Sequence, residues 1–257
     1  MTATRQERTA APVSVRRFAA LVGYVFRACL PPRRLAVLAL PVAAIVACGL
    51  VARTITDEPA HAAFADVALV GIFGFAMPLG TLVVGDAVLG AEVRSGTLAF
   101  TWSTPARFAE IAVARWLGGW AVCLLTLVPA SALAAIVAGA GRDTVAMVIG
   151  TAGGAAAHVA LFVAIGALVR RAAVWSLAVV LLVERLLGAV LSGVAQLSPS
   201  WEGRSAYVGI AGDKGDLERS GIPGGWEAVV RLGLLAVAFL VVATWALRRL
   251  QLTGSRD

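Results

Sequence analysis

Six runs of apolar residues, each long enough to cross a bilayer as a helix, occupy more than half of this 257-residue chain. A helix needs about 20 mostly apolar residues to cross ~30 Å of hydrocarbon at ~1.5 Å per residue. The runs are continuous and do not alternate with period two, which favours helices over the strands of a barrel. We therefore predict an all-α, polytopic membrane protein with spans near residues 35–52, 64–85, 111–138, 145–169, 172–191 and 228–247.

The basic residues predict the orientation of these spans. With the amino terminus placed in the cytoplasm, fifteen of the 22 Lys and Arg residues fall on inner segments, five fall on outer loops, and two lie within spans. An excess of basic residues on the inner side is the rule for membrane proteins. We expect both termini in the cytoplasm, and the net charge of +7 reflects orientation, so no nucleic-acid partner is expected.

The chain ahead of the first span divides into two parts. Residues 1–13 are polar and are expected to form a disordered cytoplasmic tail. Residues 14–30 place apolar side chains at helical spacing with arginines off that stripe, which predicts an amphipathic helix lying on the inner leaflet, as an anchor or as a coupling element. Residues 31–257 form a single six-span domain. Arg33 and Arg34 before an apolar run also resemble an export signal ending at Cys48, and an uncleaved first span is the favoured reading.

Two polar segments separate the spans. Residues 86–110 form the inner loop between the second and third spans, and residues 192–227 form an outer segment rich in Gly and Pro. In the inner loop the second span is expected to continue as a helix to Ser95, and Thr104 with Pro105 to begin the next helix. Between them the sequence predicts an elbow that presents Leu98, Phe100 and Trp102 to the cytoplasm, and exposed apolar and aromatic side chains typically form docking surfaces.

The inner loop carries a family resemblance. The run Glu-x-x-x-Gly-Thr-Leu, followed by Trp-Ser-x-Pro and a helix with spaced arginines, resembles the cytoplasmic loop of permeases of type-2 ATP-binding cassette (ABC) exporters. The resemblance covers nearly the whole chain in the order of its elements: a flat amino-terminal helix, six spans, the loop between spans two and three, and an outer re-entrant segment. It depends on these residues: Glu92, Gly96, Thr97, Leu98, Ser103, Pro105 and Arg107. In the family, basic residues often follow the proline, whereas here Arg107 is followed by Phe108, Ala109 and Glu110.

The resemblance implies a permease subunit that moves an amphiphilic or apolar cargo outward, in the plasma membrane of a bacterium. High Arg and Ala usage suggests a GC-rich, actinobacterial genome. It implies two partners, a cytoplasmic ABC ATPase that binds ATP and Mg and docks on the elbow, and a second permease copy or a related permease. Glu92 would brace the elbow or pair with an ATPase arginine. No phosphate-binding loop accompanies Lys214, the only lysine, so this chain is expected to be no enzyme, with no catalytic residue, metal or cofactor of its own.

Four charges are expected within or at the outer ends of the spans: Asp66, Glu184, Arg185 and Arg231. Because an unpaired charge in the membrane costs a few kcal/mol or more, we expect them to form one polar cluster in the outer leaflet. The favoured arrangement is a structural pair of Glu184 with Arg231, and the alternative is contact with cargo. His158, in the fourth span, is expected to make an interhelical hydrogen bond.

Two other function classes fit the sequence less well. A stand-alone transporter would use Glu184 as a proton-coupling site, or the chain would be a membrane scaffold uncoupled from an ATPase; no inverted repeat with broken helices supports the transporter. An intramembrane enzyme is disfavoured because His61 and His158 are 97 residues apart and no Gly-x-Ser-x-Gly motif occurs.

Overall fold

The structure is a computed structural model, and it describes residues 15–92, 106–169, 171–212, 217 and 221–249. All regular structure in these ranges is helical. The elements ahead of the inner loop are α1 (Val15–Ala28), α2 (Pro32–Thr54), α3 (Ala60–Val67), η1 (Ala68–Ala76), α4 (Met77–Gly85) and η2 (Asp86–Gly90). Those after it are α7 (Phe108–Val137), η3 (Gly141–Asp143), α8 (Thr144–Leu168), α9 (Ala172–Ala178), η4 (Val179–Leu187), α10 (Gly188–Val190), α11 (Ser192–Ala195), α12 (Pro199–Ala211) and α13 (Gly225–Arg249).

The six predicted spans are confirmed as helices long and apolar enough to cross a membrane. They cover Pro32–Thr54, Ala60–Gly90, Phe108–Val137, Gly141–Leu168, Ala172–Val190 and Gly225–Arg249. The second and fifth spans are composite, because π-helical stretches (η1 and η2, and η4) continue their α-helical turns. The largest error in a predicted boundary is at the end of the second span, which continues to Gly90.

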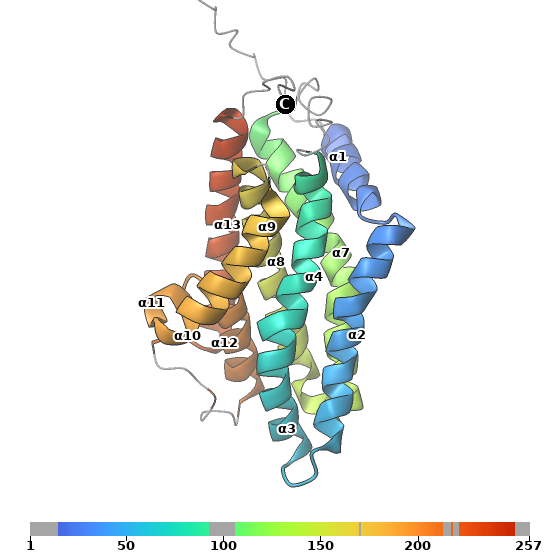
Figure 1. The fold of residues 1–257 in the computed structure, drawn as a ribbon, viewed down its shortest axis with the longest axis vertical. Coiled ribbons are helices and arrows are strands. Elements are labelled where there is room, and N and C mark those ends of the chain that lie inside the picture. The colour runs from blue at the N-terminus through green and yellow to red at the C-terminus, as the bar shows by residue number, and fades with distance from the viewer. Residues whose placement is uncertain (1–14, 93–105, 170, 213–216, 218–220, 250–257) are drawn as a thin grey trace, which may run out of the picture.

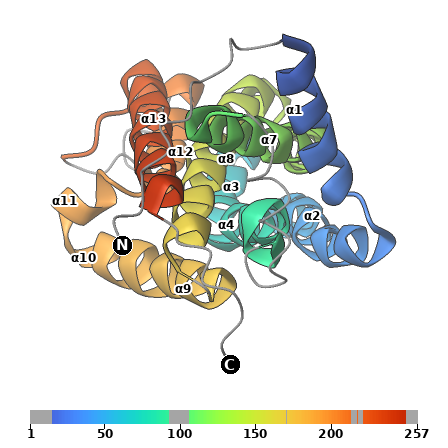
Figure 2. The same ribbon diagram turned by 90° about the horizontal axis from the view of Figure 1, so that it is seen from above.

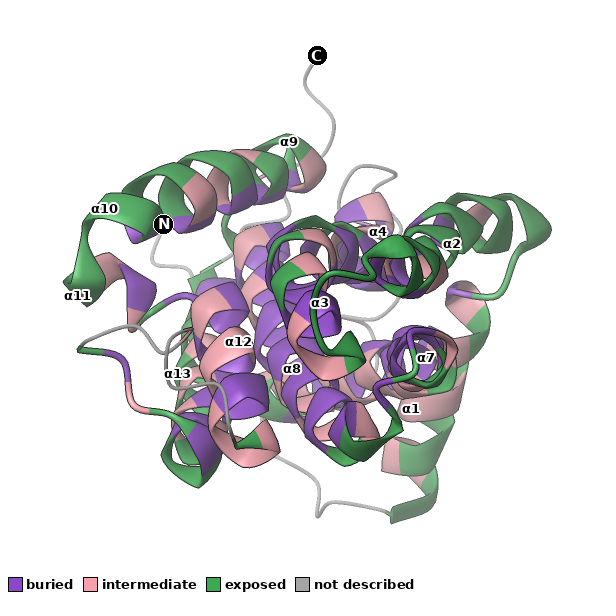
Figure 3. Ribbon diagram, turned by 90° about the horizontal axis from the view of Figure 1, so that it is seen from below, coloured by how far each residue is buried: buried purple, intermediate pink, exposed green. Residues whose placement is uncertain are grey.

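The six spans stand roughly side by side, with α8 at the centre of the bundle (Figures 1 and 2). Helix α8 contacts α4, α7, α9, α12 and α13. Seen from below, α8 is largely buried, whereas α9, η4 and α10 are exposed along their outward side (Figure 3). The fifth span therefore lies at the periphery.

Hydrogen bonds and small residues hold α8 against its neighbours. Trp116 Nε1 donates to the carbonyl of Ala156 at 2.8 Å, and Trp120 Nε1 donates to that of Ala152 at 3.0 Å. Helices α8 and α12 approach one another closely at two glycines. A Cβ atom on Gly150 would lie 2.8 Å from the carbonyl oxygen of Gly203. Because lipid tails are as apolar as leucine, helices in membranes associate through such close contacts and hydrogen bonds.

The outer segment contains a helix of 13 residues. Ser198 begins α12 as its N-cap, accepting a hydrogen bond from the backbone N–H of Trp201 at 3.4 Å, and Pro199 occupies the first turn. Gly212, with φ of +64°, ends it. The helix packs against α8, α13 and η1 at the end of the bundle opposite α1 (Figure 1). We call these the α12 end and the α1 end.

One helix start was predicted wrongly. Thr104 and Pro105 lie outside the described residues, but Ala106 and Arg107 are not helical, and α7 begins at Phe108 with an extended Arg107 as its N-cap residue.

Replacing Gly49 should destabilise the contact between α2 and α7. A Cβ atom there would lie 2.4 Å from the backbone oxygen of Ala134, so Gly49→Ala forces the helices apart and is expected to cost ~1–3 kcal/mol and lower the melting temperature by several degrees. Gly233→Ala is the matched control, because no atom lies within 4 Å of a Cβ there. Equal melting temperatures for the two variants in detergent would contradict this helix contact.

Candidate functional site

The structure brings the two flanks of the inner loop together at the α1 end. The loop's remaining candidate residues, Gly96, Thr97, Leu98, Phe100, Trp102, Ser103 and Pro105, lie outside the described residues. Glu92, which follows η2, and Arg107, which precedes α7, are described. Glu92 is buried at 9% exposure and Arg107 is exposed, so the two flanks are anchored differently.

Arg115 ties these flanks to one another. Its Nη2 atom lies 2.5 Å from Glu92 Oε2, and its Nη1 atom donates to the carbonyl of Val88. The Arg115 side chain is only 2% exposed. Arg115, counted among the inner-side charges in the sequence, is therefore a buried side chain of α7 that binds the end of the second span. The Glu92 carboxylate is thus paired within the chain itself. Its role in bracing the elbow or in pairing with an ATPase arginine stays a prediction.

Helix α1 also contacts both flanks. Arg17 Nη2 lies 2.9 Å from Glu110 Oε2 in the first turn of α7. Tyr24 lies close enough to Glu92 that the negative charge of the carboxylate, with burial and a hydrogen bond between the two side chains, raises the pKa of the Tyr24 hydroxyl. A Cβ atom on Gly118 would lie 2.8 Å from Val25, so α1 packs directly on α7. We call Arg17, Tyr24, Glu92, Glu110 and Arg115 the loop anchor.

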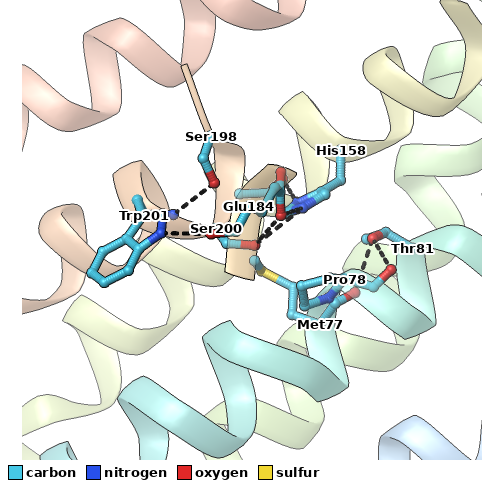
Figure 4. A network of polar contacts seen from close by, with 9 residues as sticks. Met77, Pro78, Thr81, His158, Glu184, Ser198, Ser200 and Trp201 are labelled. Carbon is cyan, nitrogen blue, oxygen red and sulfur yellow. Dashed lines mark hydrogen bonds and ion pairs between the residues drawn. The ribbon is translucent and has the colours of Figure 1, made fainter. Parts of the chain in front are cut away.

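A second polar group, which we call the outer network, joins the fifth span to α8 and α12 (Figure 4). Glu184 Oε2 lies 3.1 Å from His158 Nε2 and accepts a hydrogen bond from Ser200 Oγ at 2.5 Å. Trp201 Nε1 donates to the backbone carbonyl of Glu184 at 2.9 Å. All three polar side chains are buried: His158 at 0%, Glu184 at 2% and Ser200 at 4% exposure.

Polar contacts on both ring nitrogens fix the orientation of His158. Its Nδ1 atom lies 3.0 Å from the carbonyl oxygen of Gly154, which can only accept, so Nδ1 is the donor of this hydrogen bond. Its Nε2 atom faces Glu184 Oε2 at 3.1 Å and the Ser200 hydroxyl at 3.4 Å. Such partners lower the cost of placing polar groups inside an apolar bundle.

The interhelical hydrogen bond expected of His158 is confirmed, but the predicted pairing of Glu184 with Arg231 is wrong. Arg231 instead lies 3.4 Å from Glu227, one turn away on α13. Arg185 lies over the ring of Phe75 at 4.8 Å, and Asp66 is exposed on α3. The four charges do not form one cluster, because Glu184 takes its partners from α8 and α12 and each of the other three lies elsewhere.

Sequence reasoning missed two further buried acids at the α12 end. Asp143 Oδ2 accepts a hydrogen bond from Tyr207 at 3.0 Å, and Tyr207 stacks on Phe73 with ring centroids 5.8 Å apart. Glu202 is fully buried, and neither of its carboxyl oxygens has a hydrogen-bond partner among the residues that the structure describes. Burial raises the pKa of Glu202 to about 7, since the nearby Arg231 lowers it less than burial raises it and Glu227 raises it further.

No protein-family model matches this chain, and no curated protein matches it.

Removing Arg115 alone should lower the free energy of unfolding, whereas removing Arg115 and Glu92 together should lower it much less. Arg115→Leu leaves the buried Glu92 carboxylate without its cationic partner, which is expected to cost ~3–5 kcal/mol, whereas the double variant Arg115→Leu with Glu92→Leu should recover most of that loss. Thermal unfolding of the purified variants measures both. A single variant as stable as the original chain would contradict a buried ion pair.

Glu202 should make stability depend on pH. Its pKa is raised from 4.5 to about 7 in the folded chain, so the folded state binds the proton more tightly than the unfolded state does. Stability should therefore fall as the pH rises from about 4.5 through 7. Glu202→Gln should flatten the melting temperature across this window and should raise it at pH 8. Parallel pH curves for the two proteins would exclude a buried, titrating Glu202.

Proposed function

We propose that this protein is the membrane-spanning permease subunit of a type-2 ABC exporter, working with a separate cytoplasmic ATPase. The observation that carries the proposal is the position of the Glu92-to-Arg107 motif. It lies between the second and third of six spans, and its flanks are held by the loop anchor. The family resemblance of the motif indicates an ABC ATPase as the partner. The loop anchor provides a physical route by which force on the loop would reach the bundle.

A force on the loop would act on three elements at once. Glu92 links the end of the second span to Arg115 in α7, and Arg17 links α7 to α1. Because buried, charge-assisted hydrogen bonds resist separation, the ends of the second and third spans and α1 move together. This gives α1 a coupling role in addition to that of an anchor.

The fifth span would be the element that responds. Its outer half is held to the bundle by the outer network and by Arg185 over Phe75, while most of its surface is exposed (Figure 3). Its exposed apolar side chains provide the surface for a second permease copy, and a pathway for an amphiphilic cargo would open beside it. Orientation follows from the basic residues, with both termini and the loop in the cytoplasm of a bacterium.

Substitutions in the loop should release the ATPase without unfolding the permease. Gly96→Asp, Thr97→Asp and Trp102→Ala are each expected to reduce co-purification of a co-expressed ABC ATPase from the same genome by ~10-fold or more, as expected for hot-spot residues. Trp226→Ala, which removes an exposed tryptophan at the α12 end, is the matched control and should leave co-purification unchanged.

Unchanged co-purification in all three loop variants would contradict the coupling assignment. The stand-alone transporter would then become the better candidate, because Glu184, its expected proton-coupling site, contacts His158 inside the bundle. In that case uptake or efflux should depend on a pH gradient and not on ATP.

A further inference from the structure

A groove of about 570 Å³ lies on the surface of the bundle between α7 and α13, at the α1 end. One wall is formed by Ala109 and Val113 of α7, and the other by the face of α13 from Val237 to Arg248. At ~1.5 Å per residue this face of α13 is about 16 Å long. The groove thus begins near the end of the bundle and extends into the apolar part of the spans.

The groove is apolar along its length and ends at Arg248, the only charged side chain among the described residues that line it. The hydroxyl of Thr244 is occupied, because it donates to the carbonyl of Leu240 at 2.8 Å. Arg249 is engaged over the ring of Trp245 at 4.1 Å and does not line the groove. Arg248 is exposed and makes no hydrogen bond or ion pair with any residue in the described part of the chain. The lining is therefore that of a site for a molecule with one apolar chain and one anionic group.

The lining of the groove favours a lipid as its occupant, because an apolar face about 16 Å long with a cation at its end matches an acyl chain and a charged head group. Such a chain would lie where bilayer lipid contacts the spans. Because lipid tails are equally apolar in the groove and in the bilayer, the chain adds little discrimination, and the selectivity must come from the head group.

We propose that this groove is a binding site for an anionic glycerophospholipid of the adjacent leaflet. Its acyl chain lies along α13 beside Val237 and Val241, and its phosphate accepts hydrogen bonds from the guanidinium of Arg248. A guanidinium offers paired N–H donors that match two phosphate oxygens. A head group with a net negative charge has no choline cation that would compete with Arg248 for its phosphate. The basic excess at this end of the chain adds longer-range attraction for anionic lipid. The site does not depend on the transport function proposed above.

The test is lipid binding to the purified full-length protein in a neutral detergent, measured by native mass spectrometry. Phosphatidylglycerol and phosphatidylcholine with identical acyl chains are the two probes. The original chain should retain phosphatidylglycerol in preference, and Arg248→Gln should weaken that binding by about tenfold, the loss expected for one charge-assisted hydrogen-bonded contact. Arg248→Lys should restore part of it.

Two further variants locate the site. Arg53→Gln removes an exposed arginine at the α12 end and should leave phosphatidylglycerol binding unchanged. Ala109→Trp fills the groove and should weaken binding of both lipids while leaving Arg248 in place. Inorganic phosphate at the same concentration should not compete, because it lacks the chain.

Several outcomes would overturn the proposal. Equal retention of the two lipids, or an unchanged affinity in Arg248→Gln, would remove the head-group contact. An equal loss in Arg53→Gln would show unspecific attraction to the basic surface. Competition by inorganic phosphate would show an anion site without a lipid chain, and a second protein copy that protects Ala109→Cys from labelling in lipid-free detergent would assign the groove to a protein interface.

Discussion

The interior of a bilayer-length bundle offers no water to a buried charge, so each polar side chain there must find its partner within the protein. The loop anchor and the outer network are two solutions to this constraint. In the first, Arg115 binds both the Glu92 carboxylate and a backbone carbonyl. In the second, Glu184 contacts the His158 ring at 3.1 Å and accepts a hydrogen bond from Ser200. The buried polar side chains of each group determine which helices must stay adjacent.

The two groups act at opposite ends of the bundle and on different elements. The loop anchor joins α1, the second span and the third span, which are also packed on one another through small residues. The outer network joins the peripheral fifth span, whose outward side is exposed, to α8 and α12. A displacement of the loop would therefore be carried by a well-anchored set of helices, and polar contacts would help to hold the fifth span to them. This asymmetry is the physical basis of the proposed transport role.

The six spans could be predicted from the sequence because length and apolarity alone determine whether a helix can cross the bilayer. Which helices lie next to one another could not be predicted in this way. The sequence favours a pair of Glu184 with Arg231 because both residues are expected in the outer half of the membrane. The depth of a residue along its helix, however, does not determine which neighbouring helix its side chain contacts. One of the actual partners of Glu184, Ser200, lies in helix α12 of the outer segment. The start of this helix can be recognised in the sequence from Ser198 and Pro199. The packing of α12 against α8 could not be recognised, because it depends on Gly150 and Gly203, which are far apart in the sequence. Arg115 is counted with the inner-side charges in the sequence, because it lies only four residues past Ile111, where the third span is predicted to begin, and nothing in the sequence identifies Glu92 as its partner.

The central claim is that the loop between the second and third spans faces the cytoplasm, where an ATPase can bind it. The most direct test is cysteine labelling of Arg107→Cys in a chain whose three cysteines, Cys29, Cys48 and Cys123, are replaced by alanine. A membrane-impermeant maleimide should fail to label it in intact cells and should label it in inside-out vesicles, whereas Glu58→Cys, exposed in the hairpin at the α12 end, should show the reverse. Labelling of Arg107→Cys from outside intact cells would contradict the account.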